Sequence, residues 1–216
     1  MNINLYLIRH TQSCGNLFVK ESRPINKDYK ITKLGHKQSQ ISGEYLEKFL
    51  KKKEINIDKV FVSNKLRTNQ TYEIHRPFIY PFLINKLKKT IRLEKSNMNN
   101  LKIDKNIKKV LNVSKYDINN FINFIIECAK LDSDENLVNF LFYTHKGFIG
   151  DFYTYCKKVN KYPISNNNIY KVSLSLGNKF ELLKVDIKLI KDFSVIFSKL
   201  SPIKNDENIC ELSFVK

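Results

Sequence analysis

The chain has 216 residues and a formal net charge of +17 at pH 7, from 38 Lys plus Arg against 21 Asp plus Glu. This length suffices for one α/β domain and is short for two, so we expect residues 1–216 to form a single domain. No apolar run is long enough to cross a membrane, and the N-terminus lacks the basic segment of a signal peptide, so we expect a cytoplasmic protein.

The first half of the chain alternates between strand-like and helix-like segments. Ile3–Ile8 is apolar on both faces, which is typical of a buried strand. Thr32 is a suitable N-cap for an amphipathic helix that runs to about Lys53. The elements that we expect next are a strand at Lys59–Ser63, a helix at Lys65–Ile74 and a strand end at Thr90–Leu93.

The second half of the chain continues the same alternation. The elements that we expect are a helix at Asn119–Leu131, a buried strand at Asn136–Thr144, a helix at Gly147–Lys157, strands at Ile169–Leu176 and Lys179–Val185 joined by a turn at Gly177-Asn178, and an edge strand at Phe193–Phe197. Buried strands that alternate with helices predict an α/β fold. We expect a three-layer α/β/α sandwich, with a mostly parallel mixed sheet and helices on both faces.

The cysteines carry no recognisable spacing. Cys14, Cys128, Cys156 and Cys210 are far apart and form no CxxC pair. This pattern indicates neither a zinc knuckle nor a disulfide framework, so we expect reduced thiols in a cytosol-like compartment.

Phosphate-binding residue types follow three of the expected strands. Arg9 and His10 follow the first, Ser63–Arg67 follows the second, and His145 follows Asn136–Thr144. Only five of the 38 basic residues are Arg, and the planar guanidinium matches phosphate oxygens in a way that Lys does not. Because ligands of such folds bind beyond the carboxyl ends of the strands, we expect these segments to meet in one phosphoryl-handling site.

Five segments, taken in order, resemble motifs of the histidine phosphatase superfamily, also called phosphoglycerate-mutase-like. They are LIRHTQSCGN around His10, ITKLGHKQSQ from Ile31, SNKLRTNQT around Arg67, Arg92-Leu93-Glu94, and FYTHKGFIG around His145, with Asn168 opening a last core strand. Three departures from the family pattern stand out. Thr11 and Lys146 replace glycines, and Asn64-Lys65 replaces Pro-Leu.

The resemblance implies a role for each matching residue. His10 is the nucleophile that becomes a phosphohistidine, Glu94 is the proton donor, and no metal or cofactor is needed. The residues expected to bind the phosphoryl group are Arg9, Asn16, Arg67, His145 and Lys146. Ser13 and Arg23 are expected to contact the rest of the substrate. Glu73 is a fallback for the proton donor, and His36 and His75 are expected to be non-catalytic.

Three functions remain open at this point. A metal-independent phosphomonoesterase acting on a phosphorylated small molecule or phosphoprotein is the leading hypothesis. A cofactor-dependent phosphoglycerate mutase is disfavoured, because the chain has no Trp and no Arg pair in its middle region. A catalytically weak basic module that binds phosphate or RNA is also disfavoured, because the aromatic residues lie inside apolar runs. The net charge fits either biased composition or attraction of anionic substrates, and weakly favours multiply charged ones.

Overall fold

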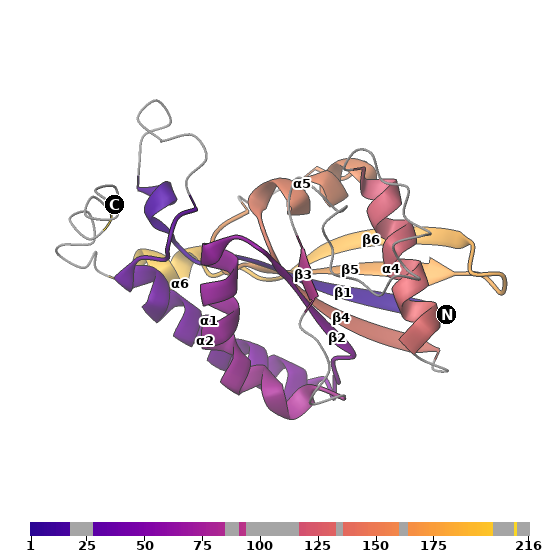
Figure 1. Ribbon diagram of the computed structural model, residues 1–216, viewed down its shortest axis with the longest axis horizontal. Coiled ribbons are helices and arrows are strands. Elements are labelled where there is room, and N and C mark those ends of the chain that lie inside the picture. The colour runs from indigo at the N-terminus through magenta and orange to yellow at the C-terminus, as the bar shows by residue number, and fades with distance from the viewer. Residues whose placement is uncertain are drawn as a thin grey trace.

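The computed structural model describes residues 1–17, 28–84, 91–93, 117–132, 136–159, 164–200 and 210. Six strands form one sheet in the order β3-β2-β4-β1-β5-β6 (Figure 1). The strands are β1 Asn2–Arg9, β2 Lys59–Ser63, β3 Ile91–Leu93, β4 Leu137–Thr144, β5 Ile169–Leu176 and β6 Leu182–Lys191. The helices are α1 Lys33–Lys52, α2 Leu66–Ile79, α4 Ile118–Asp132, α5 Lys146–Tyr155 and α6 Ser194–Ser198, with short 3₁₀ turns η1 Cys14–Asn16 and η3 Tyr80–Phe82.

The sheet is mixed, with its parallel strands grouped together. β3, β2, β4 and β1 run parallel to one another, whereas β5 and β6 are antiparallel to their neighbours. In the register of the parallel part, Arg9 lies opposite Thr144 and Val62 lies opposite Tyr143. The carboxyl ends of β1, β2 and β4 therefore coincide at one edge of the sheet. The expectation of a mostly parallel mixed sheet is confirmed.

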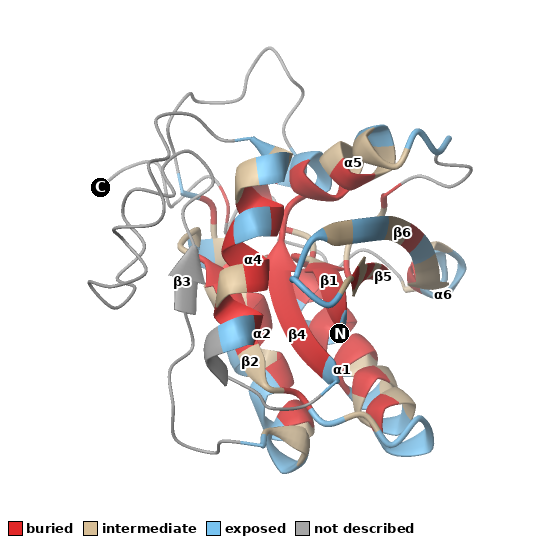
Figure 2. Cartoon of the chain, turned by 90° about the vertical axis from the view of Figure 1, so that its right-hand side faces the viewer, coloured by how far each residue is buried: buried red, intermediate tan, exposed pale blue. Residues whose placement is uncertain are grey.

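Helices cover both faces of the sheet, as expected, and each face has its own apolar core. Successive residues of β1 alternate between the two, as the period-two geometry of a strand requires. Leu5 and Leu7 pack with α4 and α5, and Tyr6 and Ile8 pack with α1, α2 and the start of α6. Figure 2 shows the resulting continuous burial through β4 and β1. This packing holds the carboxyl ends of the strands, and the loops attached to them, in a fixed arrangement.

The start of α1 fits closely against the loop that follows β1. Thr32 is the N-cap, and its side chain accepts a hydrogen bond from the Gly35 backbone N–H at 2.8 Å, as the sequence predicted. A Cβ atom at Gly35 would overlap the carbonyl oxygen of Gln12. The glycine therefore allows α1 to approach the loop that carries His10.

Three expectations about local structure were wrong. Phe193–Phe197 is not a strand, because Phe193 and Phe197 lie four residues apart and stack on one face of the α6 turn, with ring centroids 5.2 Å apart. The last strand begins at Leu182 and not at Lys179, since Phe180 has a φ of 62° and lies in the turn. α2 continues to Ile79, well beyond the expected end at Ile74.

None of the helices in the described ranges is long and apolar enough to span a membrane.

The expectation of four reduced cysteines was also wrong. Cys14 and Cys210 form a disulfide across a sequence separation of 196 residues, and both are buried with Tyr29 beside them. Cys128 and Cys156 are free thiols. Spacing along the chain could not predict the pair, because only the folded backbone brings residue 14 next to residue 210, with the Cα atoms 5.4 Å apart.

Candidate active site

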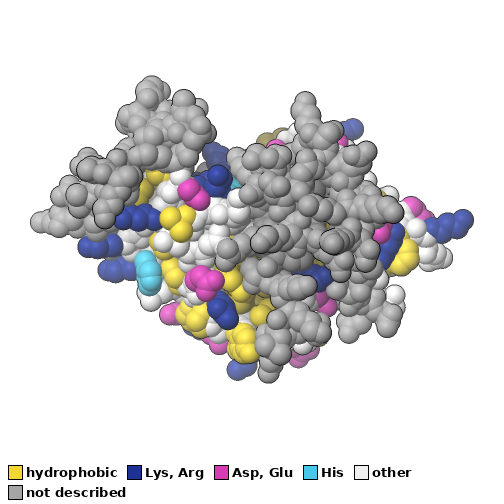
Figure 3. Space-filling model, viewed as in Figure 1, with side chains coloured by type: hydrophobic (Ala, Val, Ile, Leu, Met, Phe, Trp, Pro, Cys, Tyr) yellow, Lys and Arg dark blue, Asp and Glu magenta, His cyan; other side chains and the backbone are white. Residues whose placement is uncertain are grey.

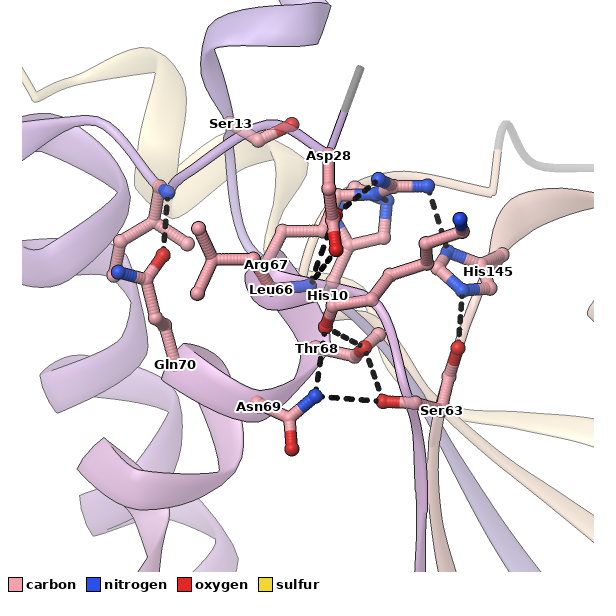
Figure 4. Close-up of polar contacts among 12 residues, drawn as sticks. His10, Ser13, Asp28, Ser63, Leu66, Arg67, Thr68, Asn69, Gln70 and His145 are labelled. Atoms are coloured by element: carbon pink, nitrogen blue, oxygen red, sulfur yellow. Dashed lines mark hydrogen bonds and ion pairs between the residues drawn. The ribbon is translucent and has the colours of Figure 1, made fainter. Parts of the chain in front are cut away.

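His10 is buried at the carboxyl end of β1, and its neighbours fix its tautomer. The Nδ1 atom lies 2.7 Å from the carbonyl oxygen of Thr11, and the Nε2 atom lies 3.2 Å from Nε of Arg67 (Figure 4). A guanidinium nitrogen can only donate, so Nε2 of His10 is the acceptor. The ring hydrogen is therefore on Nδ1 and is donated to Thr11. This leaves the Nε2 lone pair directed toward Arg67.

The surroundings of His10 keep its imidazole neutral. Burial of the ring is the main reason that the pKa of His10 is held well below its usual 6.5, and the electrostatic influence of His145, Arg67 and Arg9 lowers it further. The hydrogen bond to the Thr11 carbonyl acts in the opposite direction. A neutral imidazole has the free lone pair that a nucleophile needs.

His145 lies beside His10 at the end of the neighbouring strand. The ring centroids are 5.3 Å apart, with the ring planes inclined by 61°. Nε2 of His145 lies 2.8 Å from Oγ of Ser63, and Nδ1 lies 3.4 Å from Nη2 of Arg67. Ser63 was not singled out from the sequence. The available signal was that it ends β2 at the same edge of the sheet.

The Arg67 side chain comes from the first turn of α2 and contacts both histidines. Its Nε faces His10 and its Nη2 faces His145, while Nη1 lies 3.7 Å from Oδ1 of Asp28. The start of α2 is anchored to β2, because the side chains of Thr68 and Asn69 both donate to the carbonyl oxygen of Ser63. Arg67 is thus held by secondary structure, with its guanidinium at the centre of the site (Figure 4).

Asp28 caps α2 from a distant part of the chain. Both of its carboxylate oxygens lie 2.9 Å from the backbone N of Leu66, whereas the N-cap residue Lys65 makes no side-chain cap of its own. A carboxylate at a helix N-terminus is favourable, because the exposed N–H groups carry partial positive charge. Sequence reasoning missed this residue, because nothing in the local sequence links Asp28 to the start of α2, 38 residues away.

The loop after His10 is braced by polar contacts on several sides. The backbone N of Thr11 donates to Oγ1 of Thr71, and the Thr11 hydroxyl donates to the Gly35 carbonyl. The Asn166 amide donates to the carbonyl oxygen of His10 at 2.8 Å. Thr11 stands where the resembled motif has a glycine, and these contacts accommodate its hydroxyl.

The other residues expected to bind the phosphoryl group make their hydrogen bonds outside the group formed by His10, Arg67 and His145, are exposed, or lie outside the described residues. Nη1 of Arg9 donates to the carbonyl oxygen of Ile164 at 2.5 Å, although the Arg9 charge still lowers the pKa of His10. Oδ1 of Asn16 accepts from the backbone and hydroxyl of Ser13, so these two residues bond within their own loop. Lys146 is exposed as the first residue of α5. Glu94 and Arg23 lie outside the described residues.

His75 and Glu73 make their contacts with residues other than His10 and His145. His75 is fully buried between Ser42 and Tyr143, with its ring nitrogens 2.9 and 3.1 Å from their hydroxyls. Glu73, the fallback proton donor, is exposed on α2 and lies 3.6 Å from Arg76. Within the described ranges, no three His, Cys, Asp or Glu side chains form a group suited to a metal ion.

The arrangement of strands and helices is the phosphoglycerate-mutase-like α/β fold. Among solved structures, a mycobacterial glucosyl-3-phosphoglycerate phosphatase has a TM-score of 0.55 at 12% identity, covering 88% of this chain and 98% of its own. Mycobacterial hydrolase 2 has a TM-score of 0.53 at 10% identity, covering 98% and 97%. The TM-scores, both above 0.5, show a shared fold. No family model and no curated protein matches the chain.

Proposed function

We propose that this chain is a metal-independent phosphomonoesterase that forms a phosphohistidine at Nε2 of His10. One observation carries the proposal: Nε of Arg67 lies 3.2 Å from Nε2 of His10, and Nη2 of the same guanidinium lies 3.4 Å from His145. A neutral imidazole, a bidentate cation and a second imidazole thus meet at one point, where both histidines are buried and Arg67 is partly exposed. Phosphoryl transfer needs a nucleophile and preorganised positive charge at the same point.

The reaction has two in-line steps. In the first, the Nε2 lone pair of His10 attacks phosphorus, the P–O ester bond breaks, and the leaving oxygen takes a proton from a carboxylic acid, for which we propose Glu94. In the second, this carboxylate removes a proton from water, which attacks phosphorus and breaks the P–N bond. The products are an alcohol and inorganic phosphate, and the acid is restored. Arg67 must turn from His10 toward the phosphoryl oxygens as substrate enters.

The remaining residues of the expected site stabilise charge on the transferring group. We propose that Arg67, Arg9 and His145 face its equatorial oxygens, with Asn16 and the backbone N–H of Lys146 as neutral donors. The N–H of Lys146 lies at the start of α5, where a helix favours negative charge. Ser13 and Arg23 would contact the rest of the substrate.

A direct test is to trap the phosphoenzyme. The purified protein, with EDTA present, is mixed with radiolabelled phosphomonoesters and quenched, and the acid-labile, alkali-stable label of a phosphohistidine is measured. We expect label and phosphate release in the wild type, and neither in His10→Ala.

Turnover that disappears with EDTA would contradict a metal-free site. Isomerisation of 3-phosphoglycerate without phosphate release would favour the mutase. Salt-dependent RNA binding that survives His10→Ala, without turnover, would favour the binding module.

Three broader expectations accompany this proposal. We propose that residues 1–216 form one domain, and that the substrate is a phosphorylated small molecule or a phosphoprotein. The sequence led us to expect a cytoplasmic protein. The Cys14–Cys210 disulfide argues against that location, because such bonds persist mainly in oxidising compartments.

A further inference from the structure

A cavity of about 650 Å³ opens between the start of α1 and the first turns of α2. Its size is within the range of small-molecule sites. The polar side chains that line it are Asp28, His36, Asn64, Asn69, Gln70 and Glu73. Aliphatic side chains, including that of Leu66, lie between them. Figure 3 shows hydrophobic, acidic and histidine side chains among the exposed groups over these two helices, with Lys and Arg side chains beside them.

The cavity adjoins the proposed phosphoryl site through Asp28 and Leu66. Asp28 lines the cavity, and its Oδ1 lies 3.7 Å from Nη1 of Arg67. Leu66 also lines it and immediately precedes Arg67 in α2. A phosphoryl group held by the Arg67 guanidinium would therefore lie next to the cavity, which gives the leaving group of a phosphomonoester a place to extend.

The charge of the cavity is opposite to that of the whole chain. Its described lining contains two carboxylates, Asp28 and Glu73, and neither Lys nor Arg, although the chain has a net charge of +17. Glu73 lies 3.6 Å from Arg76, but both side chains are more than half exposed, so this pair is weak and screened. A second anionic group on the substrate would face these carboxylates without a cation from the lining to offset them.

The remaining lining groups suit hydroxyl groups and carbon-bound hydrogens. The Asn64 amide and the His36 imidazole can both donate and accept, and the Gln70 amide, whose Oε1 accepts from the Ile31 backbone N–H at 2.8 Å, can offer its N–H groups as donors. Aliphatic side chains provide surface for the apolar faces of a sugar ring. Carboxylates are strong acceptors for hydroxyl donors. The lining is thus matched to a neutral group that carries several hydroxyls.

We propose that this cavity is the leaving-group subsite and that it selects sugar or polyol monophosphates over bisphosphates. The inference rests on the proposed function only for the position of the phosphoryl group at Arg67. It replaces two expectations: that multiply charged substrates are favoured, which was drawn from net charge, and that Ser13 and Arg23 contact the rest of the substrate, since neither is part of the described lining. The net positive charge of the chain attracts anionic substrates in general, whereas the residues that line the cavity determine which leaving groups can bind there.

Calorimetry on the His10→Ala protein tests the subsite without requiring turnover. The ligands are inorganic phosphate, glucose 6-phosphate and glucose 1,6-bisphosphate. We expect glucose 6-phosphate to bind about tenfold more tightly than phosphate, and the bisphosphate about threefold more weakly than the monophosphate, because Asp28 and Glu73 are partly exposed and solvent screens their repulsion. In wild type, kcat/KM should show the same preference between the two sugars.

Two charge reversals, each combined with His10→Ala, make the test specific. Glu73→Lys should remove or invert the preference for the monophosphate, while leaving phosphate affinity within about twofold. Glu44→Lys is the matched control, because Glu44 is exposed on α1 outside the lining, and it should change nothing. A bisphosphate that binds as tightly as the monophosphate, or equal effects of the two reversals, overturns the subsite. Selective binding without hydrolysis in wild type overturns only the proposed function.

Discussion

Arg67 and His10 are 57 residues apart in the chain, yet Nε of the first lies 3.2 Å from Nε2 of the second. This contact specifies the tautomer of His10, because the guanidinium can only donate. It also places the positive charge where the oxygens of a phosphoryl group on Nε2 would be. The relationship exists because β1 and β2 end at the same edge of the sheet and α2 begins directly beyond β2.

Replacement of Arg67 by Lys should therefore cost far more than its unchanged charge suggests. A lysine ammonium cannot face His10, His145 and the phosphoryl oxygens together, as the planar fork can. We expect kcat/KM of Arg67→Lys to fall by about a hundredfold or more. Arg76→Lys is the control, because Arg76 lies on the same helix with its side chain 58% exposed. Equal kcat/KM for wild type and Arg67→Lys would refute the assignment.

Ser63 is expected to act as a positioning residue for His145. Its hydroxyl lies 2.8 Å from Nε2 of His145, and Ser63→Ala removes that partner while leaving β2 intact. We expect kcat to fall by about tenfold, since one hydrogen bond to a charged or polar group is worth about 1.5 kcal/mol. KM should change little, because the phosphoryl ligands are retained. Ser198→Ala, which removes an exposed hydroxyl bonded only locally, should leave kcat unchanged. An unaltered kcat in Ser63→Ala would show that His145 needs no such support.

Much of the site's framework could be predicted from local sequence. Ile3–Ile8 is apolar on both faces, so a buried strand followed by His10 could be inferred without a structure. Thr32 as an N-cap and Lys59–Ser63 as a strand were correct for the same kind of local reason. The assembly at the carboxyl edge could then be inferred from the general behaviour of parallel sheets.

Features that depend on long-range contact could not be predicted in this way. The hydrogen bond by which Asp28 caps α2 at Leu66 joins residues 38 positions apart, and no local sequence pattern at either position predicts this contact. The Cys14–Cys210 pair is a more extreme case. The helical turn at Ser194–Ser198 was missed because a short apolar run has no clear period, and its helical form depends on packing against α1 and its neighbours.

The depressed pKa of His10 predicts the acidic side of the pH profile. Because burial and nearby cations hold this pKa well below 6.5, the imidazole stays neutral as pH falls through 6.5. We expect kcat/KM, corrected for the ionisation of the substrate phosphate, to show no loss near pH 6.5 that is due to His10. Protonation of Nε2 can be followed directly by NMR titration of the His10 ring. A ring that titrates near 6.5 would contradict the buried, cation-flanked environment.

His75 should make the fold less stable in mild acid. Burial lowers its pKa from 6.5 to about 3, so between these values the unfolded chain binds a proton that the folded chain does not. Stability therefore falls as pH drops from 6.5 toward 3. The loss from His75 alone is on the order of 2 kcal/mol at pH 5. Denaturant unfolding at pH 7 and pH 5 measures it. His75→Asn should lose less stability between these pH values than the wild type, and an equal loss would exclude His75 as the source.

The Cys14–Cys210 disulfide should stabilise the fold, because it bonds residue 210 to the segment that follows His10. Closing a loop of 196 residues restricts the unfolded chain, and the entropic estimate for such a loop is about 5 kcal/mol, an upper bound for the change in unfolding free energy. We expect a reducing agent or Cys210→Ser to lower the Tm by several degrees. Cys156→Ser removes a free thiol and should leave the response to reductant unchanged. Thiol titration of the denatured, unreduced protein should find two reactive groups, Cys128 and Cys156. Four reactive groups, with no change of Tm on reduction, would show that the bond is not formed in the isolated protein.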